Sequence, residues 1–208
     1  AVSLPDVGTS PALGPAAIPI PRCRTPNRGY GCRMPTTTQT FESHSPADGR
    51  VIGTYPMMDA AGVQEAVDRA RIAAHWWAGL GFDERRRRLL RFKGLLARRS
   101  RELAEPVHAE NGKPTDDALL EIILSVEHTN WAALNAEKVL RRRRVKPGLL
   151  TINHDARVEY QALGVVGVIG PWNYPVFTPI GSIVYALAAG NAVGVKPAGF
   201  TPAIGQWL

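Results

Sequence analysis

The feature that most constrains the fold is an apolar strand–turn–helix–strand pattern in residues 164–200, GVVGVIGPWNYPVFTPIGSIVYALAAGNAVGVKPAGF. The first run, residues 163–169, is almost continuously apolar, which is typical of a strand buried on both faces of a parallel sheet. A helix is expected to start near Pro175 and to end at Gly190. Residues 192–196 form the second buried strand. The pattern therefore predicts an α/β fold with a parallel sheet.

Two polar side chains follow the two predicted strands. Asn173 comes after the first strand, and Lys196 closes the second. A strand–helix–strand crossover is right-handed almost without exception and brings both strand ends to the same edge of the sheet. Ligands of open α/β sheets bind beyond that carboxyl edge. We therefore expect Asn173 and Lys196 to face one cleft that holds a carbonyl oxygen and a sugar or phosphate.

Three helices are predicted before this unit. The first begins after Asp59 and runs to about residue 77. The second is capped by Asp83 and is kinked or ended by Pro106, because proline removes a backbone donor and clashes one turn back. The third spans residues 115–140. Apolar residues spaced by three and four positions predict the buried face of each helix. For the first helix these are Val63, Ala66, Val67, Ala70, Ala74 and Trp77; for the second, Leu89, Phe92, Leu96, Leu103 and Val107. For the third helix they are Leu119, Ile123, Val126 and Leu134.

The remaining segments are short β pieces and an extension. Residues 41–56 predict two strands around the turn Ala47-Asp48-Gly49, and a hairpin is expected at about 145–162, with strands over 149–161 and a turn at 153–156. Residues 1–40 are rich in proline and poor in large apolar residues, so we predict a disordered extension. The rest, residues 41–208, is interpreted as one incomplete cofactor-binding domain.

Charge and composition bear on the function class. The net charge of +7 comes largely from arginine runs at 85–88 and 141–144, which we interpret as a solvated helix start and a solvated loop rather than a nucleic-acid site. No apolar run is long enough to span a bilayer, and the start does not resemble a secretory signal. Cys23 and Cys32 match neither a zinc site nor a redox pair, so we expect a cytoplasmic setting. The histidines show no metal-ligand spacing and predict no metal site: His44, His75, His108, His128 and His154.

The pieces GVVGVIGPWNYP, ALAAGNAV and VKPAGFTP resemble the aldehyde dehydrogenase superfamily. The resemblance extends back through NGKP at 111–114 to SPADGRVIG at 45–53. Glycine, proline and tryptophan at these spacings are specific, whereas the GxxGxxG pattern alone would be weak. The resemblance implies an incomplete aldehyde dehydrogenase fold, in which helices and a hairpin precede the first strand–helix–strand of a Rossmann-like parallel sheet.

In that family a cysteine thiolate attacks the aldehyde, hydride passes to NAD or NADP, and a glutamate activates the water that releases the acid. The resemblance implies that Asn173 is the oxyanion-hole amide. It also implies that Lys196 contacts the adenosine ribose or its phosphate, and that Ile169, Pro171 and Trp172 line the dinucleotide. Two simpler alternatives remain at this point: Asn173 could merely cap the turn before a helix, and Lys196 could be a strand-end lysine in solvent.

Two departures from the family pattern matter. Gly199 stands where the family often has an acid that binds the ribose hydroxyls, so we expect weaker NAD binding or a shift toward NADP. The family's nucleophilic cysteine and general-base glutamate lie beyond Leu208, so this chain alone is expected to be catalytically inactive. The expected partners are an aldehyde and either identical or full-length subunits, since unpaired strand edges favour association. The alternatives are a non-catalytic truncated relative that acts as a binding or assembly module, and a decayed gene product.

Overall fold

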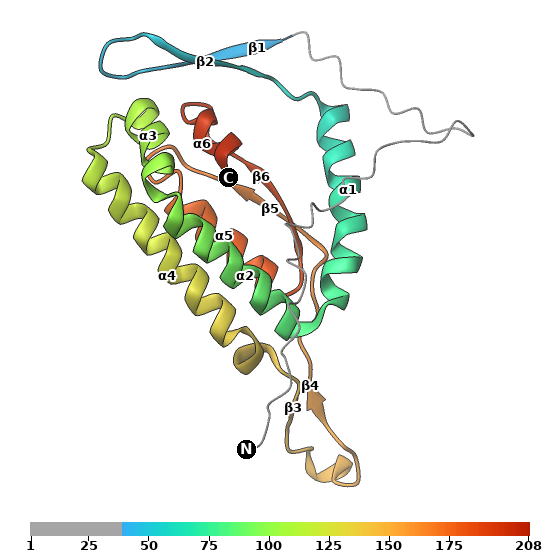
Figure 1. Ribbon diagram of the computed structural model, residues 1–208. Helices are drawn as coiled ribbons and strands as arrows, with labels where there is room; N and C mark the ends of the chain where they lie inside the picture. The colour runs from blue at the N-terminus through green and yellow to red at the C-terminus, as the bar shows by residue number, and fades with distance from the viewer. Residues whose placement is uncertain (1–38) are drawn as a thin grey trace, which may run out of the picture. The chain divides into compact units, whose positions relative to one another are not determined.

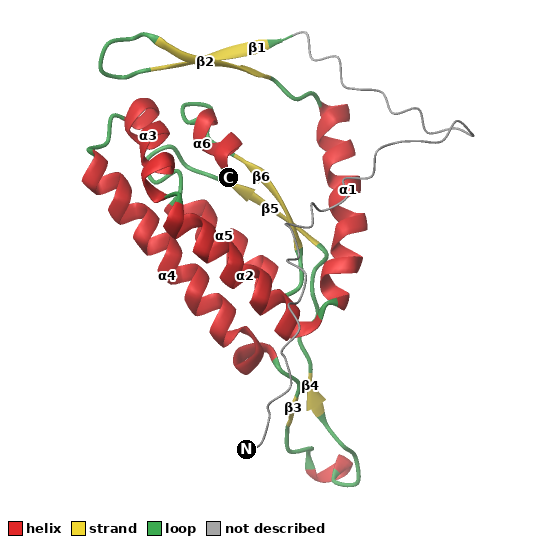
Figure 2. Cartoon of the chain, in the orientation of Figure 1, coloured by secondary structure: helices red, strands yellow, loops and turns green. Residues whose placement is uncertain are grey.

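The computed structural model describes residues 39–208 as a mixed α/β chain, which confirms the predicted fold class (Figures 1 and 2). The predicted disorder of residues 1–40 and the two cysteines fall almost entirely outside the described residues. The strands are β1 Thr40–His44, β2 Val51–Pro56, β3 Arg143–Arg144, β4 Arg157–Val158, β5 Val165–Ile169 and β6 Ala192–Lys196. The helices are α1 Ala60–Gly79, α2 Gly81–Arg98, α3 Ser100–Asn111, α4 Thr115–Leu140, α5 Phe177–Ala188 and α6 Pro202–Trp207, with one 3₁₀ turn at Leu149–Thr151.

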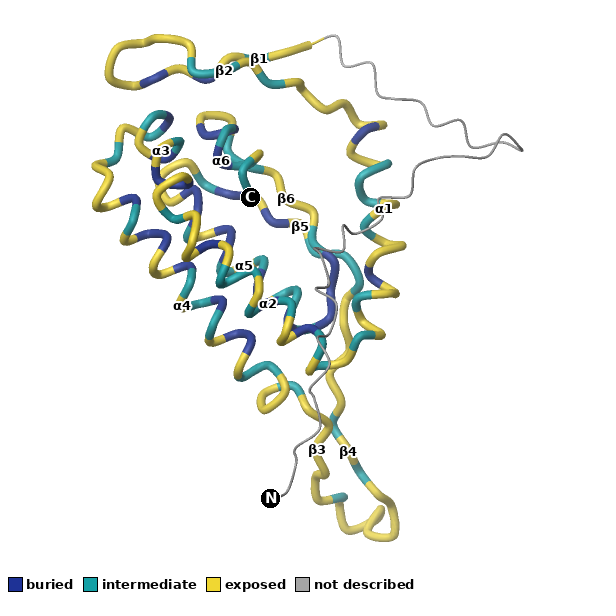
Figure 3. Tube along the Cα trace, viewed as in Figure 1, coloured by how far each residue is buried: buried dark blue, intermediate teal, exposed yellow. Residues whose placement is uncertain are grey.

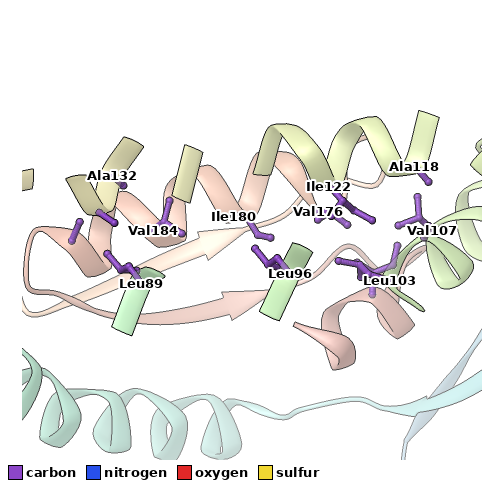
Figure 4. Close-up of a cluster of buried hydrophobic side chains, with 14 residues drawn as sticks. Leu89, Leu96, Leu103, Val107, Ala118, Ile122, Ala132, Val176, Ile180 and Val184 are labelled. Carbon is purple, nitrogen blue, oxygen red and sulfur yellow. The ribbon is translucent and has the colours of Figure 1, made fainter. Parts of the chain in front are cut away.

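The predicted strand–helix–strand unit is present. Strands β5 and β6 are parallel, with Val165 opposite Ala192 and Ile169 opposite Lys196, and α5 connects them. Helices α5 and α1 contact both strands, and the sheet lies between them (Figures 1 and 4). The expectation that both strands are buried on both faces is wrong, because Ile169 is 78% exposed and Val195 is 41% exposed. Each strand has a single hydrogen-bonded neighbour in the described chain.

The hydrophobic core lies among α2, α3, α4 and α5 (Figure 4). Leu96 and Leu103 come from α2 and α3, Ile122 comes from α4, and Ile180 comes from α5; all four are fully buried. Burying each such side chain contributes about 1.5–3 kcal/mol. These contacts fix α5, and therefore the turn before it, against the helical layer.

The predicted buried face of α4 is right in part, and the helix bounds are confirmed. Leu119 and Val126 pack against the core, as predicted. Ile123 and Leu134, by contrast, are each 55% exposed. Buried and exposed stretches alternate along α4 (Figure 3). The buried positions are mostly small or polar residues, namely Ala118, Glu121, Ile122, Ser125, Thr129, Ala132 and Ala133. The hydroxyls of Ser125 and Thr129 donate to main-chain oxygens one turn back, so their burial leaves no donor unsatisfied. Small side chains allow α4 to lie close to α2 and α5.

The predicted second helix is two helices. The first, α2, ends at Arg98, α3 begins at Ser100, and Pro106 lies inside α3. Pro106 therefore neither ends nor divides this segment; Leu103 and Val107 are fully buried on either side of it, and their packing stabilises the helix. Asp83 is not the cap either, because α2 starts two residues earlier, at Gly81. By contrast, the Asp59 side chain accepts from the Gly62 N–H at 2.7 Å, which confirms that cap.

The hairpin near residue 150 is present, but its strands lie at other positions than predicted. Strand β3 pairs antiparallel with β4, whereas the predicted first strand contains the exposed 3₁₀ turn at Leu149–Thr151. Leu149 and Leu150 are 86% and 97% exposed, and no strand between residues 39 and 208 covers them. The N-terminal hairpin, β1 with β2, agrees with the prediction, and Gly49 in its turn has a φ of 72°.

Side chains from α1 and α2 hold the C-terminal end of α5. The Trp77 Nε1–H donates to the Leu187 carbonyl at 2.7 Å, and the Arg85 Nε–H donates to the Ala188 carbonyl at 3.2 Å. Arg85 also donates to the Ala78 carbonyl at 3.1 Å, and burial lowers its pKa. The expectation that the whole first arginine run is solvated is therefore wrong at Arg85. Between residues 39 and 208, no helix has both the length and the apolar character needed to span a bilayer.

Candidate functional site

The carboxyl ends of β5 and β6 are adjacent. Ile169 is opposite Lys196, and the Gly170 N–H donates to the Lys196 carbonyl at 2.9 Å, which extends the ladder by one residue. The chain then turns through residues 171–176 before α5 begins. The structure therefore places the turn that carries Asn173 and the end of the strand that carries Lys196 at the same edge of the sheet. Both side chains are exposed.

The main chain of this turn is held by the segment between α3 and α4. The Asn111 Nδ2–H donates to the Trp172 carbonyl at 2.5 Å, and the Lys113 Nζ–H donates to the Asn173 carbonyl at 2.9 Å. The Lys113 ammonium also lies 4.1 Å from the centre of the Tyr174 ring, a cation–π distance. The main-chain carbonyls before and after the Cα of Asn173 are thus both hydrogen-bonded.

Glu121 binds the main-chain N–H groups of Val176 and Phe177, at the start of α5. Its carboxylate is fully buried, and Oε1 accepts from the Val176 and Phe177 N–H groups at 2.8 and 2.9 Å. Its Oε2 accepts from the Lys113 Nζ–H at 2.7 Å. The first amides of a helix have no partner within the helix and carry a partial positive charge, so a carboxylate there stabilises the helix start. Glu121 is therefore the N-terminal cap of α5, supplied from α4.

Glu110 has the same role at α6, the helix that follows β6. Its carboxylate accepts from the Ala203 and Ile204 N–H groups at 3.0 and 3.3 Å, and from the Ser43 hydroxyl at 2.8 Å. Helix starts commonly bind phosphate through such free amides. At both helices that follow these two strands, buried glutamates already occupy those amides.

The surface around the strand ends combines exposed apolar side chains with one cation. Ile169 and Trp172 are 78% and 57% exposed and offer apolar area, and Pro171 is half-buried beside them. Lys196 supplies the cation there. A Cβ on Gly199 would meet no atom within 4 Å, so the surface after β6 is open at the position of the missing acid.

Other parts of the described chain do not join this site. A hollow on α4 and α5 is lined by Glu127, His128, Trp131 and Tyr185. Over residues 39–208, no group of three His, Cys, Asp or Glu side chains is arranged to hold a metal ion.

Sequence reasoning identified neither Lys113 nor Glu121 as site residues, nor Asn111 or Glu110. The motif NGKP was a visible signal for Asn111 and Lys113. The buried glutamates gave none, because the main-chain amides that they bind lie 55 to 94 residues away.

The comparisons with known proteins agree with the predicted resemblance. The model of the aldehyde dehydrogenase family matches residues 33–208. A 4,4'-diapolycopene aldehyde oxidase from Methylomonas is 35% identical over 171 residues, which is 81% of this chain and 32% of that relative.

Solved structures show the same similarity. An NAD-dependent benzaldehyde dehydrogenase from Corynebacterium glutamicum is 34% identical with a TM-score of 0.76, over 82% of this chain and 36% of that one. An NADP-dependent glyceraldehyde-3-phosphate dehydrogenase from Bacillus halodurans, complexed with NADP, is 27% identical with a TM-score of 0.75, over 82% and 36%. The chain spans about a third of the length of the relatives it matches. On these grounds, the chain belongs to the aldehyde dehydrogenase family.

Proposed function

We propose that this chain contributes to the NAD(P)-dependent oxidation of an aldehyde to a carboxylic acid. Its part would be a hydrogen-bond donor for the reacting carbonyl oxygen and the first part of a nucleotide-binding surface. The observation that carries the proposal is the common edge at which the Asn173 turn and Lys196 lie, fixed by the Gly170–Lys196 hydrogen bond. The names of the relatives, which are aldehyde-oxidising and NAD- or NADP-dependent enzymes, support the same chemistry.

Asn173 would donate its Nδ2–H to the oxygen that becomes negatively charged when a nucleophile adds to the aldehyde. A neutral amide that is already oriented stabilises this charge without reorganisation, and removing one such donor costs about 3–4 kcal/mol. The hydrogen bonds to the carbonyls of Trp172 and Asn173 fix the main chain at Asn173 and so support this role. A residue that only capped the helix would be redundant, because Glu121 already caps α5.

Lys196 would bind the adenosine ribose or its phosphate, and Ile169, Pro171 and Trp172 would pack against the dinucleotide. The nucleotide, when bound, accepts the hydride of the aldehyde. The glutamates at the starts of α5 and α6 leave Lys196 as the group at this edge that attracts a phosphate. The exposed strand residue Val195 supports association with identical or full-length subunits that would cover it.

Titration calorimetry with NAD and NADP tests the cofactor part. Lys196→Met is expected to weaken nucleotide binding by at least about tenfold, since one bond to a charged group is lost. Lys138→Met, at the exposed end of α4, is the matched control and is expected to bind as the parent chain does. Equal binding by the Lys196 and Lys138 variants would refute the assignment of Lys196.

Aldehyde oxidation by the protein that carries this chain tests the catalytic part. Asn173→Ala is expected to lower kcat by 100-fold or more, as the loss of an oxyanion donor does elsewhere, while nucleotide affinity stays unchanged. Production of NAD(P)H from an aldehyde series measures kcat and KM separately. An Asn173→Ala variant with the parent's kcat would show that another group holds the oxyanion.

A further inference from the structure

We propose that Lys113 and Glu121 form a buried ion pair whose function is to position Asn173. They are positioning residues, because neither is expected to touch the substrate. The inference rests on the proposed role of Asn173 and adds to it the device that holds its backbone in place. The pair comes from the NGKP segment and from α4, more than fifty residues before the turn that it holds.

The carboxylate is the first half of the device. Glu121 has a side-chain exposure of 0%, so its charge is taken out of water and must be compensated by the protein. Its oxygens accept from two main-chain N–H groups, at Val176 and Phe177, and from the Lys113 ammonium. These bonds fix the start of α5, and with it the direction in which the preceding turn enters the helix.

The ammonium is the second half. The Lys113 side chain is 13% exposed, and its Nζ–H groups donate to Glu121 at 2.7 Å and to the Asn173 carbonyl at 2.9 Å. The same ammonium lies over the Tyr174 ring. One cation therefore binds the residue proposed to act in catalysis, its neighbour, and the carboxylate that caps the helix three residues later.

The two side chains bind only each other and the segment of residues 173–177, as far as the hydrogen bonds and ring contacts of the described chain show. An ion pair that served general stability would be expected to link elements without such a focus. Buried ion pairs are weak stabilisers compared with apolar packing, and in some proteins they serve to fix one conformation. Three charge-assisted bonds from this pair to one turn, with a fourth inside the pair, indicate that use here.

The test compares the parent chain with the Lys113→Met/Glu121→Gln double variant by ¹H–¹⁵N NMR. The double variant avoids an unpaired buried charge, which would destabilise a single Lys113→Met variant strongly. Two signals are followed: the side-chain Nδ2 resonances of Asn173, and hydrogen exchange of the Val176 and Phe177 amides. We expect the Asn173 resonances to shift and the two amides to exchange at least about tenfold faster, since each loses a bond to a charged acceptor.

Two controls separate positioning from general destabilisation. Leu89→Ala removes buried apolar volume in α2 and lowers stability; Leu89 lies near Ala188, at the opposite end of α5 from the turn. Lys138→Met removes an exposed lysine at the end of α4. If the Asn173 resonances in the double variant move no further than in Leu89→Ala, the proposal is wrong.

A second variant covers the case in which the double variant does not fold. Lys113→Arg keeps a positive charge beside Glu121, so no buried charge is left unpaired. Its larger planar guanidinium differs in shape from the ammonium that lies between Glu121, the Asn173 carbonyl and the Tyr174 ring, so it is expected to displace the Asn173 resonances as well. Unchanged Asn173 signals in a folded Lys113→Arg chain would overturn the proposal. None of these signals depends on nucleotide binding or aldehyde turnover, so a failure of the proposed function would leave the outcome readable.

Discussion

Replacing Glu110 with glutamine is expected to lower the free energy of unfolding by about 2–3 kcal/mol. The carboxylate accepts from the Ser43 hydroxyl and from the N–H groups of Ala203 and Ile204. Bonds to a charged acceptor contribute about 1.5–3 kcal/mol and bonds to a neutral one about 0.5–1.5, so each retained bond weakens by about 1 kcal/mol. The glutamine NH₂ would also face the fully buried Ile204 N–H, and an unsatisfied buried donor costs about 1–3 kcal/mol. Relief from burying a charge offsets part of this loss.

Urea unfolding followed by circular dichroism measures the change, with the slope checked for constancy between variants. Glu105→Gln is the matched control, because Glu105 is an exposed residue of the same helix, α3. Faster amide exchange at Ala203 and Ile204 would localise the effect to the start of α6. A Glu110→Gln chain as stable as the Glu105→Gln chain would refute the view that this carboxylate holds α6 and β1 in place.

Three further changes have defined outcomes. Gly199→Glu is expected to raise NAD affinity and to lower NADP affinity, each by about tenfold, as read by calorimetry; unchanged affinities for both would contradict the role assigned to this position. Arg85→Met removes two bonds to helix-terminal carbonyls and is expected to cost about 3 kcal/mol of stability, whereas Arg91→Met, on an exposed part of α2, should cost almost nothing. Hydrogen bonds from Arg157 and Arg144 hold the pKa of Asp155 below its usual range. Its stabilisation of the β3–β4 hairpin is therefore present above the pKa of the unfolded chain and lost as pH falls through the lower folded pKa, so hairpin amide exchange should accelerate only in acid and lose this dependence in Asp155→Asn.

Much of the fold could be predicted from local patterns. The strand at 192–196 matches β6 residue for residue, the Asp59 cap was read from its position, and α4 has the predicted bounds. These features depend on nearby residues, and the sequence shows such residues directly. The buried face of α4 could not be read in the same way, because several of its large apolar residues, such as Ile123 and Leu134, are exposed while buried alanine and serine residues allow close helix packing. Close approach between helices is a property of the tertiary structure.

The candidate site shows the same limit. Glycine and proline residues indicate the turn that contains Asn173, and the strand–helix–strand pattern brings Lys196 to the same edge of the sheet. Neither pattern indicates that Glu121 would be the partner of the Val176 amide, 55 residues away. A buried glutamate in the middle of α4 looks like an ordinary polar position in a periodicity analysis. Only the tertiary structure shows that the Glu121 carboxylate accepts hydrogen bonds from three donors.

Helix α5 is anchored by side chains at both of its ends. Trp77 and Arg85 hold its last carbonyls, and Glu121 holds its first amides. A hydrogen-bonded helix of 12 residues is a stiff rod about 18 Å long. An axial shift of a few tenths of an ångström at its far end would therefore reappear at the turn that carries Asn173. Residues of α1 and α2 that are remote from Asn173 in sequence thus set the position of this turn, and under the proposed function substitutions there would change the reaction rate.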